Sequence, residues 1–256
     1  MKEKTGIAIV GYSRPDYLKQ CLESVGKNNL GGADEVIVCL DYKDDETMKA
    51  NLAVVEQSGF TKVVPSMKNE GVAANKNKGL AYFMERGYDH IFLMEDDILM
   101  KDPKTCLKYV AYAQMMKLEH LNFAHHGPAN VGSEKIYHLK AGMMTVYPHC
   151  VGAFSYYSKK CIEAVGYFDT NFKNAWEHVE HTYRIIYADM HPPFWYFPDY
   201  PASKKLLEEI PGSIDNSSIR PRSDWKENIA AGQVYWINKH KNWIPDFPTD
   251  DWNKKD

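Results

Sequence analysis

Short apolar runs alternate with helical patterns over the first hundred residues, and this alternation restricts the folds open to the chain. Residues 7–12, IAIVGY, form a continuous apolar run that is typical of a strand covered on both faces. Residues 35–41 (EVIVCLD), 61–66 (TKVVPS) and 90–97 (HIFLMEDD) are further strand candidates. Because helical patterns separate these runs, we expect an α/β fold with a mostly parallel sheet and helices on both faces.

The expected helices have recognisable ends. Ser13 is placed to cap the first helix, and Pro15 fits its first turn. Further helices are expected over residues 48–57, 72–86 and 104–120. The pattern then changes to short strands and loops with an expected antiparallel pairing, followed by helices over residues 159–165 and 174–189. No clear linker interrupts the chain, which favours one domain over residues 1–256 with two halves.

Composition and charge argue against several classes of protein. The net charge of −3 gives no reason to expect a nucleic-acid partner. No apolar stretch is long enough to span a membrane, and the short run before Gly11 predicts a strand rather than a signal peptide. The five cysteines are scattered without a C-x-x-C pair, so we expect reduced, mostly buried thiols and a cytoplasmic protein.

Three consecutive acids, Glu95, Asp96 and Asp97, end the fourth strand candidate between bulky apolar residues. Such a run repels itself and loses hydration, so it needs a positively charged partner. Ligands of parallel sheets bind beyond the carboxyl ends of the strands, where Asp41 also lies. A divalent cation with oxygen ligands suits this place, and the alternative is a solvated acidic turn that caps the next helix.

Residues 69–79, NEGVAANKNKG, combine small residues with two lysines. Gly71 and the alanines that follow allow a ligand or another backbone to approach closely. Lys76 and Lys78 lie two apart and so point in different directions, and one of them could reach a phosphate. The alternative is an ordinary helix start with solvated lysines.

Residues 174–184, NAWEHVEHTYR, place two glutamates and two histidines on one helix. Glu177 and Glu180 are three apart, as are His178 and His181, so each pair shares a face. A carboxylate or an imidazole here could serve as a general base or a metal ligand. The H-E-x-x-H zinc pattern is absent, and the alternative is a surface helix with local Glu–His pairing.

Taken in order, four segments resemble family 2 glycosyltransferases that use nucleotide-diphospho-sugars. IAIVGYSRPDYLKQCLESV resembles the family's opening strand and helix, and NEGVAANKNKGL its asparagine–glycine segment. MEDD resembles its D-x-D metal motif, and GYFDTNFKNAWEHVEHTYR its late tryptophan–glutamate–aspartate segment. The resemblance implies a GT-A-like, Rossmann-type sheet with a small antiparallel part on the acceptor side. Residues 1–100 would bind the nucleotide-sugar, and residues 101–256 the acceptor.

The resemblance also implies a role for each matching residue. The nucleotide-binding residues would be Tyr12, Arg14, Asp41, Lys76 and Asp96. Glu95 and Asp97 hold the outer positions of the D-x-D motif and would bind Mn²⁺ or Mg²⁺. The family often adds a late histidine to the metal, which His181 or His191 would supply. The acceptor would contact Trp176 and Gly152.

Two departures from the family pattern affect these roles. Glu95 replaces the first aspartate of the D-x-D motif, and His178 replaces the aspartate that is often the catalytic base. Either Glu177 or His178 would be the base, and we favour Glu177 because a carboxylate stays ionised at neutral pH.

The activity implied by the resemblance is metal-dependent transfer of a sugar, with inversion, from a nucleotide-diphospho-sugar to an acceptor hydroxyl. UDP is the expected nucleotide. A sugar-phosphate nucleotidyltransferase is one alternative, although GYSRPDYL lacks the glycine-rich basic loop that such an enzyme carries after its first strand. A non-catalytic carbohydrate-binding module would explain the aromatic residues, but it would not explain the acids of MEDD.

Overall fold

A computed structural model of the chain describes residues 2–139, 142–172, 175–192, 195–221 and 223–240. Its central sheet has six strands in the order β3–β2–β1–β4–β9–β6. The first four strands are parallel, whereas β9 runs antiparallel to both β4 and β6. The bounds are β1 Thr5–Gly11, β2 Glu35–Leu40, β3 Val63–Pro65, β4 His90–Glu95, β6 His120–Asn122 and β9 Phe154–Ser158. The expected mostly parallel α/β sheet is confirmed.

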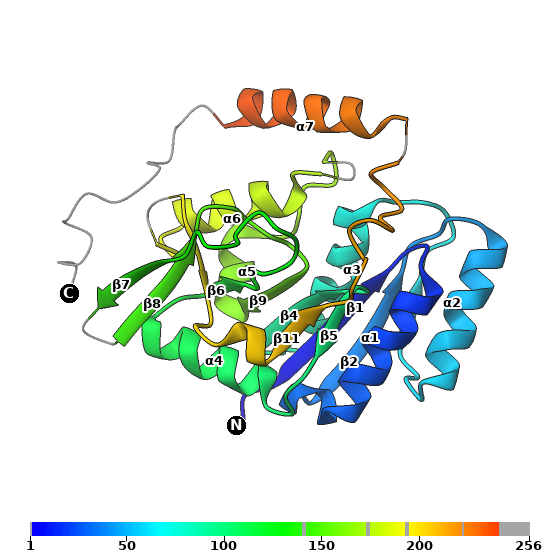
Figure 1. The fold of residues 1–256 in the computed structure, drawn as a ribbon, viewed down its shortest axis with the longest axis horizontal. Coiled ribbons are helices and arrows are strands. Elements are labelled where there is room, and N and C mark those ends of the chain that lie inside the picture. The colour runs from blue at the N-terminus through cyan, green and yellow to red at the C-terminus, as the bar shows by residue number, and fades with distance from the viewer. Residues whose placement is uncertain (1, 140–141, 173–174, 193–194, 222, 241–256) are drawn as a thin grey trace.

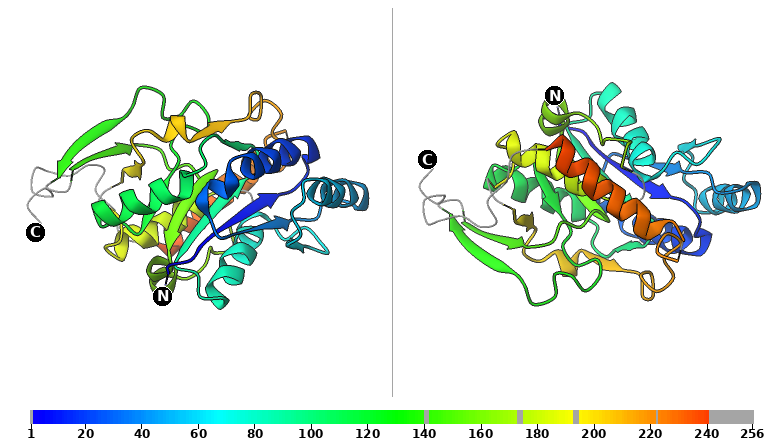
Figure 2. Two further views of the ribbon diagram at one scale, coloured as in Figure 1. Left: turned by 90° about the horizontal axis from the view of Figure 1, so that it is seen from below. Right: turned by 90° about the horizontal axis from the view of Figure 1, so that it is seen from above.

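Helices cover both faces of this sheet. One face packs against α1, α2 and α4, and the other against α3, α5 and α6. The alternation along β1 sets this division, because Ile7 and Ile9 face the first group while Ala8 and Val10 face the second. The left view of Figure 2 shows β1 between α1 and α3. The bounds are α1 Pro15–Lys27, α2 Asp45–Gln57, α3 Val72–Glu85, α4 Thr105–Met116, α5 Lys159–Val165 and α6 Glu177–Tyr187.

Helix α3 packs very closely on β1. A Cβ atom at Gly79 would lie only 2.3 Å from the Cβ of Ala8, so this position of the helix accepts no side chain. Lys76 lies three residues earlier on α3 and therefore shares that inward face. The close contact brings Lys76 to the carboxyl end of the sheet.

The second half of the chain adds smaller elements. An antiparallel sheet contains β7 (Lys135–Leu139), β8 (Gly142–Tyr147) and β10 (Phe197–Asp199), which confirms the expected antiparallel pairing. A second pair contains β5 (Ile98–Met100) and β11 (Leu207–Glu209). Two 3₁₀ turns are η1 (Asn29–Gly32) and η2 (Ser203–Lys205). A final helix, α7 (Trp225–Lys239), lies beyond the carboxyl ends of the parallel strands and near α6, as Figures 1 and 2 show.

Two helix starts differ from the expected ones. The N-cap of α1 is Arg14, with no side-chain hydrogen bond at the cap, so the expected capping role of Ser13 is wrong. Helix α2 begins three residues before the expected start, because the side chain of Asp44 accepts a hydrogen bond of 2.7 Å from the backbone N–H of Thr47.

Two other helices are shorter than expected. Helix α4 ends before Lys117, which adopts a left-handed φ of 56°, and His120 already belongs to β6. Helix α6 begins after Trp176. The left-handed φ of 73° at Trp176 is not helical, so the helix does not extend further toward the N-terminus. The expected start at Asn174 lies outside the described residues.

The cysteines match the expectation of reduced, mostly buried thiols. All five cysteines are free thiols, and four of them are buried. None of the helices in the described ranges has the length and apolar character needed to cross a membrane.

Candidate active site

The first of two clefts at the carboxyl ends of the parallel strands has a volume of about 610 Å³. Its walls come from the loops after β1, β2 and β4, from the start of α3, and from Ser218 and Ile219. Five of the predicted site residues line it: Tyr12, Arg14, Asp41, Glu95 and Asp96.

The second cleft, of about 860 Å³, lies beside the first and shares Val72, Glu95 and Ile219 with it. Three more predicted residues line it, namely Gly152, Glu177 and His178. His126, Arg220 and Trp225 also line it, although the sequence did not single them out. The two clefts therefore meet at the carboxylate of Glu95.

Lys76 lies buried beneath the two clefts and contacts residues of both. Its side chain is 1% exposed, and its Nζ lies 2.8 Å from Glu95 Oε1, 3.1 Å from Glu177 Oε1 and 3.3 Å from the carbonyl oxygen of Gly152. An ammonium has three donors, so all of them are used by the protein. Burial would lower the pKa of Lys76, but Glu95 and Glu177 outweigh it and raise the pKa.

These contacts change two interpretations of Lys76. The alternative of a solvated lysine is wrong, because the side chain is buried. The expected contact with the nucleotide finds no support either, since Lys76 lines neither cleft and its donors already have protein acceptors.

Glu177 and His178 form a second pair at the floor of the second cleft. Glu177 is 3% exposed, and its Oε1 lies 3.1 Å from His178 Nδ1. Burial alone would raise the pKa of Glu177, but Lys76 and then His178 lower it well below its usual range. The alternative of an exposed surface helix is wrong for this face of α6, because Glu177, Glu180 and His181 are all buried.

Gly152 provides the space for the imidazole. A Cβ atom at Gly152 would lie 2.8 Å from His178 Cγ and 3.0 Å from its Cβ. Any larger residue would therefore displace the ring. Gly152 also accepts the hydrogen bond from Lys76 described above, so one residue fixes both neighbours.

The other two acids pair with Arg14. Its Nη2 donates to Asp96, and it lies 2.9 Å from Asp97 Oδ2. Burial, together with the charge of Asp97, raises the pKa of Asp96 against the opposing effect of Arg14. Burial would also raise the pKa of Asp97, but pairing with His126 and Arg14 lowers it to about 2. The acid run is thus held by the cations Arg14 and Lys76, with the imidazole of His126 beside Asp97.

A divalent cation fits this arrangement in part. Asp97 Oδ1 is buried and has no hydrogen-bond partner among the described residues, and such an oxygen suits Mn²⁺ or Mg²⁺. His126 Nε2 lies 3.4 Å from Asp97 Oδ2 and likewise has no hydrogen bond within the described ranges. No group of three or more His, Cys, Asp or Glu in this part of the chain could hold a metal, so a bound cation needs further ligands from outside.

The two predicted late histidines do not join the acids. His181 Nε2 lies 2.8 Å from the carbonyl oxygen of Gly166, and its ring packs on Phe168. His191 is buried, with its ring 5.9 Å from that of His120. Among the described residues, neither forms a hydrogen bond or ion pair with Glu95, Asp96 or Asp97, so His126 is the better placed histidine.

Trp176 and Asp41 form hydrogen bonds that hold neighbouring segments of the fold. The indole N–H of Trp176 donates a hydrogen bond of 3.1 Å to the carbonyl oxygen of Ile229 in α7, and Gly232 packs over its ring. Trp176 lines neither cleft, whereas Trp225 of α7 lines the second. Asp41 lines the first cleft, but its carboxylate accepts backbone N–H groups of residues 42, 70 and 71 and so anchors the loop before α3.

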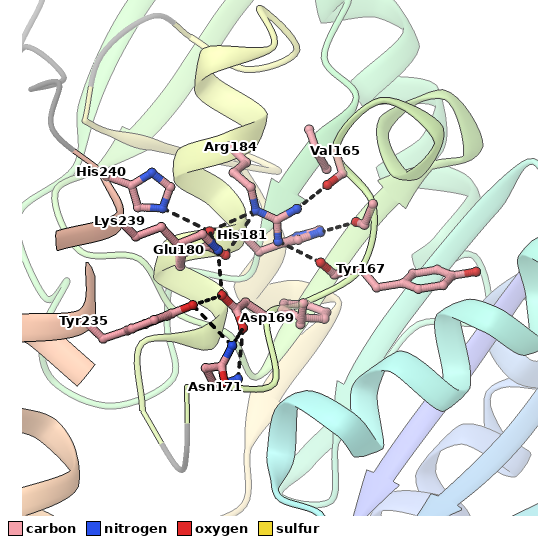
Figure 3. Close-up of polar contacts among 12 residues, drawn as sticks. Val165, Tyr167, Asp169, Asn171, Glu180, His181, Arg184, Tyr235, Lys239 and His240 are labelled. Atoms are coloured by element: carbon pink, nitrogen blue, oxygen red, sulfur yellow. Dashed lines mark hydrogen bonds and ion pairs between the residues drawn. The ribbon is translucent and has the colours of Figure 1, made fainter. Parts of the chain in front are cut away.

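Helix α7 is tied to the body by a charged cluster near its C-terminal end (Figure 3). Lys239 Nζ lies 2.6 Å from Asp169 Oδ2 and 2.8 Å from Glu180 Oε1. His240 Nε2 is 3.0 Å from the same Glu180 oxygen, and the hydroxyl of Tyr235 donates to Asp169. Glu180 is fully buried on α6, one turn after Glu177. These contacts position the helix whose first residue, Trp225, lines the second cleft.

A comparison with known families gives a match for the first part of the chain. The model of glycosyl transferase family 2 matches residues 7–117, which include Arg14, Lys76 and the whole acid run. This segment, which is less than half of the chain, is similar to the family 2 glycosyltransferases. Glu177 and His178 lie beyond the matched region. No curated protein matches the chain significantly.

Solved structures share the fold over nearly the whole of this chain. The mannosyltransferase PcManGT from Pyrobaculum calidifontis has a TM-score of 0.60 at 13% identity over 96% of this chain and 66% of its own. TarS 1–349 from S. aureus has a TM-score of 0.55 at 12% identity, over 92% of this chain and 66% of that one.

A third solved structure is glucosyl-3-phosphoglycerate synthase from Mycobacterium tuberculosis. It has a TM-score of 0.55 at 11% identity, over 95% of this chain and 81% of its own. The chain spans only 40% of the longer TarS structure. At these identities the likeness shows the GT-A type of fold alone.

Proposed function

We propose that this chain is a metal-dependent, inverting glycosyltransferase that moves a sugar from a nucleoside-diphosphate donor to an acceptor hydroxyl. The observation that carries the proposal is the junction of the two clefts at Glu95. A donor in the first cleft would present its sugar at this junction, and an acceptor in the second would approach it from the side of Glu177 and His178. We take a UDP-sugar as the first donor to test.

The acids after β4 are the proposed metal site. Asp97, with its unpartnered Oδ1, and Glu95 would hold Mn²⁺ or Mg²⁺. When bound, the ion offsets the negative charge that grows on the diphosphate leaving group. The solved PcManGT structure contains GDP-Man and Mn²⁺, and the synthase structure contains UDP and Mg²⁺, which supports this choice of cofactor.

Residues 1–100 supply most of the proposed donor site. Arg14 places a guanidinium, held by Asp96 and Asp97, in the first cleft, where its charge complements a diphosphate. Tyr12 lines the same cleft, and Asp41 holds the loop that carries Gly71 into its wall. Residues 101–256 supply most of the second cleft, where the acceptor would bind.

The proposed reaction needs no covalent sugar–enzyme intermediate. The acceptor hydroxyl attacks the anomeric carbon on the face opposite the diphosphate, so the configuration inverts. The pair Glu177–His178 stands at the floor of the second cleft and would take the hydroxyl proton.

The test is donor turnover in the absence of an acceptor. The protein is incubated with Mn²⁺ and a panel of UDP-, GDP- and TDP-sugars, and nucleotide release is measured. We expect one donor to be hydrolysed, with the activity abolished by EDTA and by Asp97→Asn and unchanged by Glu85→Gln, which alters an exposed carboxylate on α3. Neither nucleotide release nor manganese-dependent binding of any donor would refute the proposal, and synthesis of a nucleotide-sugar from a sugar phosphate would favour the nucleotidyltransferase.

A further inference from the structure

We propose that His178 Nε2 accepts the proton of the acceptor hydroxyl, that Glu177 orients the imidazole, and that Lys76 holds Glu177 in place. This inference rests on the proposed transferase activity. It replaces the preference for Glu177 as base that the sequence alone suggested.

Glu177 is poorly placed to accept a proton. Its carboxylate is buried, and Oε1 lies 3.1 Å from both Lys76 Nζ and His178 Nδ1. A proton on this carboxylate would leave the fully buried ammonium of Lys76 with Glu95 as its only charged partner among the described residues. Removing one charge from a buried pair is costly, so the ion pair keeps Glu177 ionised throughout the reaction.

The same contact prepares His178 for the task. An ionised carboxylate can only accept hydrogen bonds, so the hydrogen of the neutral imidazole must be on Nδ1. The lone pair is then on Nε2, which has no hydrogen-bond or ion-pair partner among the described residues. The side chain of His178 is 24% exposed and lines the second cleft. A carboxylate that selects the tautomer of a basic histidine is the logic of the Ser-His-Asp triad.

The surroundings of His178 keep the ring in this position. Gly152 lies against the imidazole, with no room for a Cβ atom. Lys76 binds the carbonyl oxygen of Gly152 as well as Glu177, so the ring and its carboxylate partner share one buried anchor. Besides Glu177, the other charged or titratable residues that line the cleft beside His178 are Glu95, His126, Cys150 and Arg220.

The proposed step balances as follows. The acceptor oxygen forms a bond to the anomeric carbon while the bond from that carbon to the terminal phosphate oxygen breaks. The electron pair of the broken bond leaves with the nucleoside diphosphate. The hydroxyl proton moves to His178 Nε2, the resulting imidazolium is stabilised by Glu177, and the proton later passes to solvent through the open cleft.

The experiment uses water and azide as nucleophiles, because the acceptor is not identified. With the donor found in the panel, His178→Ala is expected to slow nucleotide release by about 100-fold, a typical contribution of a general base. Sodium azide attacks without losing a proton, so it should restore nucleotide release in this variant and yield a glycosyl azide of inverted configuration. His149→Ala, at an exposed histidine that lines neither cleft, is the matched control and should behave like the wild type.

A second variant separates chemistry from folding. His178→Asp returns a carboxylate to this position and should recover much of the lost rate. Its pH profile should keep activity at lower pH than the wild type, because a carboxylate loses its proton at lower pH than an imidazole. His178→Asn, of similar size but without a basic group, should recover nothing.

Glu177→Gln tests the positioning role. The amide can still contact His178, but its neutral oxygen no longer selects the tautomer as strongly, so kcat should fall at least tenfold with the donor KM unchanged. Wild-type turnover in His178→Ala, or azide rescue confined to Glu177→Gln, would overturn the proposal. Failure of the transferase function looks different: the wild-type protein itself then binds and hydrolyses no donor, and both proposals fall.

Discussion

Lys76 Nζ and Glu177 Oε1 lie 3.1 Å apart in the buried base of the site, although 101 residues separate them in the chain. The pair joins α3, which belongs to the first half of the chain, to α6 of the second half. With Glu95 as its other partner, Lys76 connects the end of β4 to the floor of the second cleft. Residues of the two clefts therefore share one buried cation.

We expect Lys76→Met to destabilise the protein by about 3 kcal/mol, because it leaves Glu177 buried without its cation. The change in unfolding free energy is measured by urea denaturation. Lys78→Met, two residues later on the same helix and partly exposed beside Glu70, is the matched control and should cost less than about 1 kcal/mol. Equal costs for the two variants would contradict the assigned importance of the buried pair.

Gly152→Ala should reduce activity more than stability. The added Cβ would meet His178 Cγ at 2.8 Å and push the imidazole from its place, at a cost of about 1–3 kcal/mol in overpacking. We expect nucleotide release to fall at least tenfold while donor affinity is kept. Gly26→Ala in α1, where a Cβ atom meets nothing within 4 Å, should leave activity unchanged and raise stability slightly. A fully active Gly152→Ala protein would show that the ring position does not matter.

Metal dependence should be traceable to Asp97. Calorimetry is expected to show that Mn²⁺ strengthens UDP binding at least tenfold in the wild type and has little effect in Asp97→Asn, which loses one anionic ligand. Asp102→Asn is the control, since its carboxylate pairs with Lys108 and lines neither cleft. The metal assignment fails if the manganese effect persists in Asp97→Asn.

The attachment of α7 should depend on pH through Asp169. Burial would raise the pKa of Asp169, but hydrogen bonds from Lys239, from the backbone of Asn171 and from Tyr235 lower it from 3.8 to about 2. Because the folded-state pKa is the lower one, the ionised carboxylate stabilises the fold above about pH 4, and this contribution is lost as pH falls through 2.

Asp169→Asn is therefore expected to cost about 1 kcal/mol at pH 6, a modest value because the group is partly solvated. The difference from the wild type should shrink between about pH 4 and 2. Thermal unfolding of both proteins at several pH values measures it. A difference that stays constant across this range would mean that the charge of Asp169 contributes nothing to holding α7.

Local sequence patterns were sufficient for the four parallel strands of the central sheet and for the place of the acid run. Apolar runs and helix ends depend on neighbouring residues, so the order of strands and helices up to residue 100 could be read directly. The position of Glu95–Asp97 at a strand end followed from the same pattern. The burial of Lys76 could not be predicted in this way, because Lys78 has the same local surroundings and only the distant Glu177 distinguishes the two.

Other parts of the site depended on tertiary contacts that no local pattern reports. His126 sits in a loop after β6 and meets Asp97 only through the fold, whereas His181 and His191 are turned into the core. Trp176 was expected to contact the acceptor, but Ile229 and Gly232 of α7 contact its ring instead. The segment that forms α7 has apolar residues on more than one face, so its position on α6 was not apparent from its periodicity.

The contact between Gly79 and Ala8 has a consequence for redesign of this protein. Since no methyl group fits between α3 and β1, the rotation of the helix about its axis is set by backbone sterics. The direction of the Lys76 side chain is therefore set by this uncharged contact, which lies about one helical turn away on α3. Substituting Gly79 would thus change the electrostatics of both clefts without altering any ionisable group. Efforts to change which ligands bind in either cleft should therefore leave this helix–strand contact intact.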